Sequence, residues 1–188
     1  HLVPADDGVP ICSLELYSMM ARRENGGWGR THDSYSREDL CFGIFRHQGA
    51  LYCLCCTGGK NISYLLRSLD NGRTWNRTWT WDPSTQGCAN SDGNRILLTD
   101  SENNRPVVRD VDSDIIAKRD DLVGKRYTQI CGRDGRWNFS GDNSPSGGNP
   151  FVDYWENGIP QTVFTSDRRY AMWSECDPSS AIRLVLFG

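Results

Sequence analysis

The residues of this chain that are best suited to chemistry are its eight cysteines. Cys53, Cys55 and Cys56 lie close together in a segment rich in leucine and tyrosine and bounded by glycines, which predicts a β-strand. Because side chains alternate between the two faces of a strand, we expect Cys53 and Cys55 on one face and Cys56 on the other. Sulfurs placed in this way suit disulfides to different neighbouring segments.

Two other kinds of site compete with disulfides at these cysteines. A structural zinc site needs a second cysteine pair or histidines at a regular spacing. Of the histidines His1, His32 and His47, only His47 lies near a cysteine pair. A catalytic thiol needs a positioned base and usually stands alone. The cluster therefore favours disulfides, with a metal site and a catalytic cysteine as the alternatives.

Cysteine number and sequons both indicate a secreted protein. An even count of cysteines is typical of an oxidising compartment, and three N-x-[ST] sequons add possible glycosylation sites at Asn61, Asn76 and Asn138. The chain begins at His1, as expected of a processed mature protein. It has no apolar run of about 18 residues that would span a membrane. Its net charge of −3 gives no electrostatic reason to bind nucleic acid.

The 188 residues are enough for two small domains. Residues 11–23 predict one helix, because apolar side chains recur at helical spacing, and Asn25-Gly26-Gly27 is expected to end it. Short apolar runs between turn residues predict strands elsewhere, and Asn71-Gly72 and Asp134-Gly135 predict hairpin turns. The predicted fold class is therefore mainly β with one N-terminal helix.

A polar segment that ends in proline, residues 100–106, predicts a domain boundary. We expect a cysteine-rich domain over residues 1–103, with the helix and about five strands, and a β-sandwich of about seven strands over residues 104–188. Each side has an even number of cysteines, so each domain can close its own disulfides. Cys131 then pairs with Cys176, while the six upstream cysteines leave fifteen connectivities open. The predicted disulfide residues are Cys12, Cys41, Cys53, Cys55, Cys56, Cys88, Cys131 and Cys176.

A segment from Ser68 to Trp75 matches the S-x-D-x-G-x-T-W Asp box that is seen in sialidase propellers. A propeller needs several blades of about 40 residues or more, and the match occurs once, without a detectable repeat. We therefore interpret the motif as structural, with Asp70 bonded to turn amides and Trp75 packed beneath. Trp75, Trp79 and Trp81 share one face of the predicted strand, which favours core packing over a sugar-binding platform.

Carboxylates adjoin one another in three places: Asp6-Asp7, Asp120-Asp121 and the alternating run from Asp110 to Asp114. A glycosidase needs two carboxyl groups about 5–9.5 Å apart, which sequence spacing alone does not show. The alternating run lacks the glycine and the distal glutamate of an EF-hand loop, so a solvated edge strand is favoured over a calcium site. We expect no catalytic constellation, no cofactor and no metal.

The cysteine pattern resembles that of the dual-domain secreted-in-xylem (SIX) effectors of Fusarium wilt fungi, which include the avirulence effectors of tomato wilt. The break at residues 100–106 and the strand-rich remainder match the second domain of that family. The resemblance implies structural bridges only and carries over no catalytic or binding residue. The residues that carry it in the first domain are Cys12, Cys41, Cys53, Cys55, Cys56 and Cys88.

That resemblance implies a secreted virulence or avirulence effector that acts in the host xylem or apoplast, with entry into host cells left open. We expect a monomer without enzymatic activity, whose partners are a host plant protein and a plant immune receptor. Two alternatives stay open: an apoplastic inhibitor of a host hydrolase and a glycan-binding module that uses the tryptophans. A glycan array and a protease-inhibition panel would separate these two.

Overall fold

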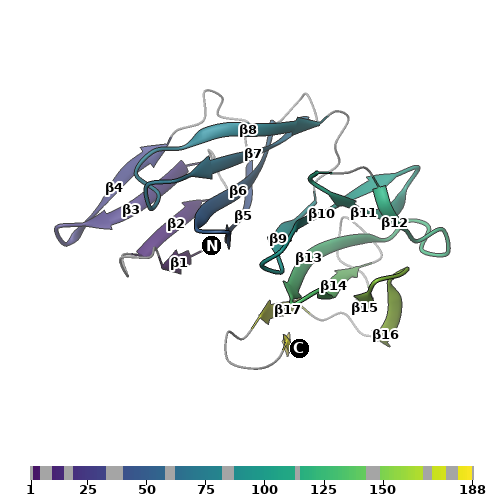
Figure 1. Cartoon of the computed structure of the whole chain (residues 1–188). Coiled ribbons are helices and arrows are strands. Elements are labelled where there is room, and N and C mark those ends of the chain that lie inside the picture. The colour runs from purple at the N-terminus through teal and green to yellow at the C-terminus, as the bar shows by residue number, and fades with distance from the viewer. Residues whose placement is uncertain are drawn as a thin grey trace. The chain divides into compact units, whose positions relative to one another are not determined.

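The computed structural model describes residues 2–4, 10–14, 19–32, 40–57, 62–81, 87–112, 115–142, 149–166, 171–176 and 182–187. The described residues form antiparallel strands and turns and contain no helix. Their strands build five sheets, four of four strands and one of two, in which strands adjacent in sequence are hydrogen-bonded to one another (Figure 1). Each sheet is therefore a meander.

The first and second sheets hold the N-terminal strands: β1 (Leu2–Pro4), β2 (Pro10–Leu14), β3 (Met19–Glu24), β4 (Gly27–His32), then β5 (Leu40–His47), β6 (Ala50–Thr57), β7 (Ile62–Ser68) and β8 (Asn76–Trp81). The third, fourth and fifth sheets hold the others: β9 (Ala89–Ser91), β10 (Ile96–Glu102), β11 (Arg105–Asp110), β12 (Ile115–Lys118), then β13 (Arg126–Arg133), β14 (Arg136–Asp142), β15 (Phe151–Glu156), β16 (Gln161–Thr165), and finally β17 (Ala171–Cys176) and β18 (Ile182–Phe187). Within the described ranges, we find no helix with the length and apolar character needed to traverse a bilayer.

The chain divides into two compact units, His1–Gln86 with the first two sheets and Gly87–Gly188 with the other three. The boundary predicted at residues 100–106 lies instead within the hairpin that joins β10 to β11. Asn103 and Asn104 form the turn of this hairpin, with φ angles of 51° and 60°. The two units hold five and three cysteines, so the even split expected from the sequence does not apply to them.

The helix predicted over residues 11–23 is wrong, because β2 and β3 occupy most of that segment. The two strands pair with each other, and Ile11 opposes Arg22. Asn25-Gly26 is a two-residue hairpin turn with φ angles of 51° and 81°, the positive values that this turn requires. Pairing in a four-stranded sheet thus outweighs a helix-like spacing of apolar residues, which is a weak predictor by itself. Residues 15–18 lie outside the described ranges.

The predicted C-terminal β-sandwich is also wrong. The third and fourth sheets each run in sequence order, whereas the Greek-key connections of a sandwich link strands of two different sheets. Their facing side chains share a core in which Trp137 and Phe139 are fully buried. The first and second sheets share a core of their own, which contains Ile11, Leu66 and Trp75. Four-stranded meander sheets that share a core within each unit therefore replace the predicted helix and sandwich.

A β-bulge occurs in the fourth strand of each four-stranded sheet. The registers skip one residue in β4, β8, β12 and β16, and the skipped residues are Thr31, Thr78, Ile116 and Val163. The hydroxyl of Thr78 donates to the Leu65 carbonyl of the adjacent strand at 3.3 Å. Bulges twist an edge strand and limit its pairing with further strands. The sheets thus repeat the same backbone device, although its residue types differ.

Candidate functional site

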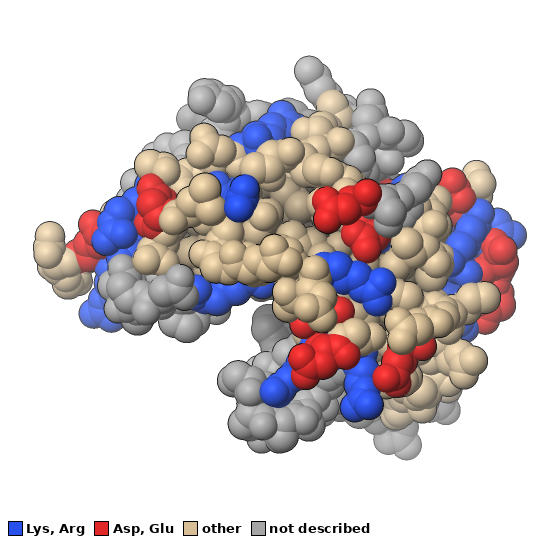
Figure 2. All heavy atoms as spheres, in the orientation of Figure 1, with Lys and Arg blue, Asp and Glu red and all other residues tan. Residues whose placement is uncertain are grey.

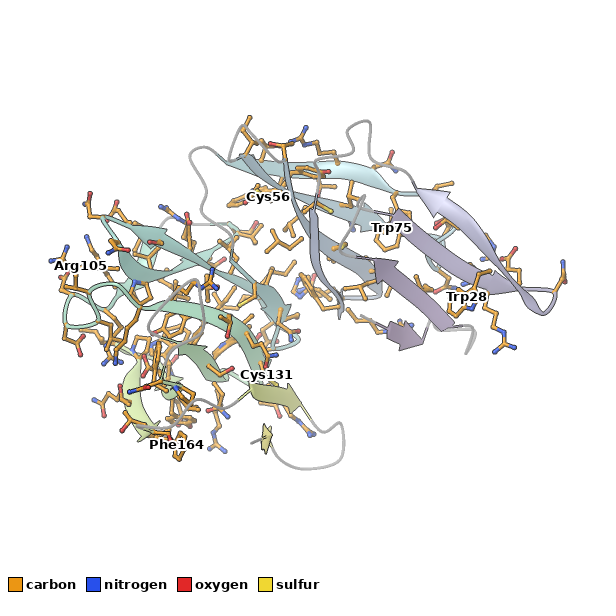
Figure 3. The ribbon with its side chains drawn as sticks, turned by 180° about the vertical axis from the view of Figure 1, so that it is seen from behind. Trp28, Cys56, Trp75, Arg105, Cys131 and Phe164 are labelled. Carbon is orange, nitrogen blue, oxygen red and sulfur yellow. The ribbon has the colours of Figure 1, made fainter. Side chains whose placement is uncertain are left out.

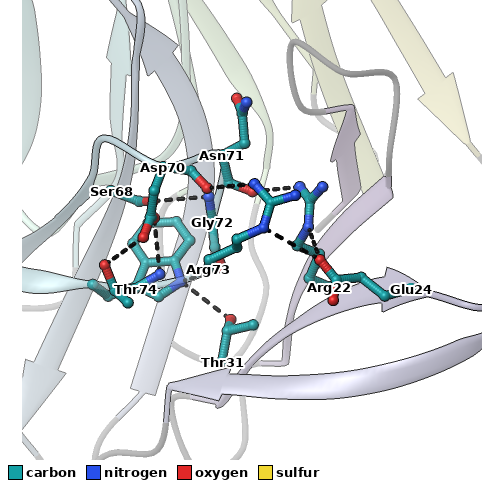
Figure 4. Close-up of polar contacts among 10 residues, drawn as sticks. Arg22, Glu24, Thr31, Ser68, Asp70, Asn71, Gly72, Arg73 and Thr74 are labelled. Atoms are coloured by element: carbon teal, nitrogen blue, oxygen red, sulfur yellow. Dashed lines mark hydrogen bonds and ion pairs between the residues drawn. The ribbon is translucent and has the colours of Figure 1, made fainter.

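The Asp-box hairpin joins β7 to β8 and closes a network of hydrogen bonds (Figure 4). The Asp70 carboxylate accepts bonds from the Thr74 amide at 2.8 Å, the Thr74 hydroxyl at 2.6 Å and the Ser68 hydroxyl at 2.8 Å. The Ser68 oxygen in turn accepts a bond from the Gly72 amide at 2.8 Å. The motif therefore satisfies its own turn, as the sequence predicts.

Trp75 and Arg22 fasten this hairpin to the first sheet. The indole N–H of Trp75 lies 3.2 Å from the Gly72 carbonyl and 3.3 Å from the hydroxyl of Thr31, the bulge residue of β4. Arg22 donates to the Asn71 carbonyl at 2.5 Å. Trp75 is only 8% exposed, which confirms the core role predicted for it. Trp79 is half-buried and does not belong to this core, and the side chain of Trp81 lies outside the described part of the structure. The hairpin is therefore a fastening point within the first unit.

The charge of Asp70 is stabilised by its hydrogen bonds. Partial burial acts to raise the pKa of Asp70, but the bonds from Thr74 and Ser68 outweigh burial and lower the pKa from 3.8 to about 2. A carboxylate that stays ionised is a poor proton donor near neutral pH, and its oxygens are already engaged by donors of the turn. The Asp box is therefore structural.

Asp70→Asn should lower the free energy of unfolding by the pH-dependent contribution of the Asp70 charge. The pKa of Asp70 is about 2 in the folded chain and 3.8 without its partners, so its charge stabilises the fold fully above the higher value. This contribution disappears as the pH falls through the lower value, and after solvent screening it amounts to about 1–2 kcal/mol. The Tm difference between the wild type and Asp70→Asn should therefore shrink with acidification.

Thr74→Val tests the same network with a smaller change, because it removes the hydroxyl that donates to Asp70 and keeps the backbone amide that also donates to it. Its Tm should fall between those of the wild type and Asp70→Asn at neutral pH. Parallel curves of Tm against pH for the wild type and Asp70→Asn would contradict the assignment.

A second polar cluster lies in the unit Gly87–Gly188, around the guanidinium of Arg119. Its Nη1 donates to the Asp153 carboxylate at 2.5 Å and to the Pro160 carbonyl at 2.8 Å. Its Nε and Nη2 bond the two oxygens of Asp121 at 2.8 and 2.7 Å, and Nη2 also donates to the Thr162 hydroxyl at 3.1 Å. All five N–H groups of the guanidinium therefore have acceptors within the chain.

Asp153 is the buried counterpart of Arg119, and its side chain is fully enclosed. It also accepts bonds from the Tyr127 hydroxyl at 2.6 Å and the Thr162 hydroxyl at 2.8 Å. The bond to Asp121 raises the pKa of Arg119, while burial, together with the Asp153 charge, raises the pKa of Tyr127. The paired guanidinium lowers the pKa of Asp121 to about 2. Arg119 and Asp121 thus stay charged, and every donor of the guanidinium is bonded within the chain, which favours a structural role over binding or proton transfer.

The strand β6 carries its cysteines in the predicted alternation. Cys53 and Cys55 belong to the core of the first unit, and Cys56 is buried outside that cluster. The sulfur atoms of Cys53 and Cys55 lie 4.0 Å apart, well beyond the S–S bond length of about 2.05 Å. Cys88 is a thiol 3.0 Å from the Thr99 hydroxyl, and burial raises its pKa to about 12. Cys53, Cys55 and Cys56 are also thiols in this structure, so it differs at all four residues from the disulfides that the sequence predicts.

Cys131 is disulfide-bonded. Its predicted partner, Cys176, is the last residue of β17, a strand that packs near β13 (Figure 3 labels Cys131). The side chain of Cys176 lies outside the described part of the structure, so this pairing stays a prediction. The side chains of Cys12 and Cys41 also lie outside it.

The remaining candidate residues are dispersed. Asn76 is exposed at the start of β8, whereas Asn138 is half-buried in the middle of β14, a strand paired on both sides. In the acidic run, the Asp112 amide donates to the Asp110 carboxylate at 3.0 Å. Among the side chains that the structure describes, no three metal-ligating groups come together. Outside the described residues lie Asp6, Asp7, Asn61 and Asp114.

Surface charge does not single out a site on the face drawn in Figure 2. Described Lys and Arg side chains there lie among Asp and Glu side chains, with broad uncharged areas between them. Charged side chains of the described residues also form ion pairs, such as Lys118 with Glu102 at 2.8 Å and Arg109 with buried Asp100 at 3.2 Å. This face therefore offers little for a ligand that is recognised by charge alone.

The edge strand β16 differs from the other edges of the described sheets. Every other described edge strand of more than three residues contains a charged residue or a proline, which discourage pairing with further strands. β16 contains neither and is exposed along most of its length, with Phe164 half-buried (labelled in Figure 3). Val163 at its bulge is 63% exposed, and nearby Ile159 is 66% exposed. We call Ile159 and β16 together the β16 surface.

Comparison with solved structures defines the class of fold. The chain is 14% identical to a chain in the structure "YCF48 bound to D1 peptide", with a TM-score of 0.59 over 99% of this chain and 59% of that one. It is also 14% identical to "Dihydro-heme d1 dehydrogenase NirN in complex with DHE", with a TM-score of 0.53 over 96% of this chain and 40% of that one. Both are β-propeller proteins, so the meander sheets form a propeller-like β fold.

No protein-family model and no curated protein matches the chain. The chain spans 59% and 40% of the length of the two propeller chains, less than two thirds of each. The single Asp box is therefore the turn of one sheet in a propeller-like series. The other sheets lack a matching sequence signature but have the same meander order.

Proposed function

We propose that this chain is a polypeptide-binding module without catalytic activity, and that it holds an extended segment of another protein against the β16 surface. The observation that carries the proposal is the uncharged, exposed edge of the fourth sheet. An edge strand presents unpaired backbone N–H and C=O groups, and an extended peptide can satisfy them by adding a strand. The bulge at Val163 restricts that pairing to a short segment.

The chemistry of the β16 surface also specifies its partner. Val163 and Ile159 offer apolar contact. A charged residue of the incoming strand would lose water on binding, and β16 has no opposite charge that could compensate for this loss. A partner segment should therefore be uncharged, with β-branched or apolar side chains alternating along it. A fold neighbour, YCF48, has a peptide bound in its structure, which supports peptide binding as a use of this fold.

The arrangement of polar groups favours binding over catalysis. The oxygens of Asp70 and the donors of Arg119 are occupied by groups of the chain itself. The propeller-like fold does not decide the question, because one fold hosts many functions.

The cysteine spacing extends the proposal to a host plant protein as the partner and to a secreted effector as the biological role. This part rests on the resemblance alone, since the helix and the sandwich expected with it are replaced by meanders in the described residues. Hydrolase inhibition and glycan binding stay alternatives, although buried Trp75 is not available to a sugar platform.

A test uses synthetic peptides of about ten residues, the upper length of common strands, in which threonine and valine alternate. The comparison peptide has lysine at every second threonine position. We expect the uncharged peptide to bind, measured by fluorescence anisotropy, and to slow amide exchange at residues 161–165. Val163→Lys should weaken this binding by about tenfold or more, since a lysine would then lie at the paired edge.

Val123→Lys is the matched control, because Val123 is a 59% exposed valine of the same unit that lies outside β16. It should bind the peptide like the wild type. Equal binding by the Val163 and Val123 variants, or protection confined to other strands, would overturn the proposal. Sedimentation analysis without peptide gives a third outcome. If the wild type dimerises and Val163→Lys does not, the β16 surface binds a second copy of this chain instead.

A further inference from the structure

We infer that Cys41 and Cys55 form a cross-strand disulfide when the chain folds under oxidising conditions. The register of β5 and β6 pairs Cys41 with Cys55, next to a bulge that skips Phe42. Opposed residues in an antiparallel pair have Cα atoms about 4.5–5.5 Å apart, and a disulfide needs about 4.4–6.8 Å. In a regular ladder this pairing would bring the two residues within bridging distance, and in this structure Cys55 is a buried thiol.

The neighbours of the other two β6 cysteines make this pairing selective. Across the ladders, Cys53 opposes Ile44 and Leu66, and Cys56 opposes Leu40 and Ser63. Cys55 opposes Tyr64 on its other side, so it is the one β6 cysteine with a cysteine directly across either ladder.

A link between Cys53 and Cys55 is disfavoured by their position on one strand. Residues two apart along a strand are separated by about 6.6 Å, near the upper limit for a bridge. Their sulfurs are 4.0 Å apart in this structure. Cys53 therefore lies close to the inferred bond without taking part in it, which makes it a matched control.

The reaction needs an oxidant, and we assign that role to a small disulfide such as oxidised glutathione. The thiols of Cys41 and Cys55 lose two protons and two electrons as the Sγ–Sγ bond forms, and the oxidant leaves as two molecules of reduced glutathione. Cys55 is fully buried once folded, so the exchange must take place before the core closes.

Trypsin makes the test direct, because cleavage after Arg37, Arg46 and Lys60 separates the residues concerned. Cys41 is the single cysteine of peptide 38–46, and peptide 47–60 carries all three β6 cysteines. The full chain is refolded in a glutathione buffer, alkylated and digested without reduction. We expect a 38–46/47–60 conjugate that reduction splits, with fragmentation spectra that locate the bond at Cys55.

Two variants sharpen the result. Cys55→Ser should abolish the conjugate, whereas Cys53→Ser, at an equally buried position of the same core cluster, should keep it. If a variant fails to fold, the wild-type map decides by itself. A bond from Cys41 to Cys53, to Cys56 or to any other peptide would overturn the inference, as would alkylated Cys41 in the folded, oxidised chain. Neither outcome bears on peptide binding at β16, so the two proposals fail separately.

Discussion

Asp153→Ala should destabilise the unit Gly87–Gly188 by about 3–5 kcal/mol, a large share of the stability of an ordinary domain. The carboxylate is fully buried and accepts bonds from Arg119, Tyr127 and Thr162. Its removal leaves the guanidinium of Arg119 as a buried charge with one partner fewer, and leaves the Tyr127 hydroxyl without this acceptor. Urea unfolding monitored by tryptophan fluorescence measures the loss.

Asp121→Ala is the control, because it removes the other carboxylate that binds Arg119. The side chain of Asp121 is 64% exposed, so we expect a loss of about 1 kcal/mol or less. If Asp153→Ala does not fold, Arg119→Met combined with Asp153→Leu removes both charges and should recover much of the stability. Equal losses in the two alanine variants would show that the buried pair is not the centre of the cluster.

Trp75→Ala should cost about 3–5 kcal/mol in the unit His1–Gln86, as expected for an aromatic side chain removed from a core. Trp75 packs in the cluster that includes Ile11 and Leu66 and is 8% exposed. Its indole N–H also bonds the Gly72 carbonyl, so the variant loses core volume and a fastening of the Asp-box turn. Thermal unfolding monitored by circular dichroism gives the shift in Tm.

Trp28→Ala is the matched control for that variant, because Trp28 belongs to the same unit and is 51% exposed. A surface change of this kind should stay within about 0.5 kcal/mol. Trp75→Phe keeps a ring in the core and loses the indole bonds, which should cost about 1 kcal/mol. A Trp28 variant as unstable as Trp75→Ala would contradict the assignment of Trp75 to the core.

The strands could be predicted from the sequence because their signals are local. A segment rich in leucine, tyrosine and cysteine and bounded by glycines marked β6, and Asn71-Gly72 and Asp134-Gly135 marked hairpin turns that the structure contains. Asn25-Gly26 misled because asparagine and glycine end helices as well as join strands. At residues 100–106, a turn built from two asparagines resembled a linker.

The fold class could not be predicted because its repeat lies in the backbone. Five turns share positive φ at two successive residues, and four of them have glycine at the second residue, but such turns indicate hairpins and do not show how the sheets pack together. These turns are Asn25-Gly26, Gln48-Gly49, Asn71-Gly72, Asn103-Asn104 and Asp134-Gly135.

The turn of the Asp box was interpretable from the sequence because the hydrogen bonds of Asp70 and Ser68 span only two to four residues. The Arg119–Asp153 pair joins residues 34 positions apart, and only the folded sheets bring them together. The available signal was a charged residue among the apolar residues Phe151, Val152 and Trp155, which marks a buried carboxylate that needs a partner. Cysteine pairing has the same limit, since it depends on the strand register.

The sequential order of the strands has a consequence for how this chain folds. Every described strand is hydrogen-bonded to strands next to it in sequence, so each sheet has a low contact order and its loops close at a small entropic cost. A sheet can therefore form while later parts of the chain are still being synthesised or exported. A substitution that slows one meander should delay that sheet and leave those already formed intact.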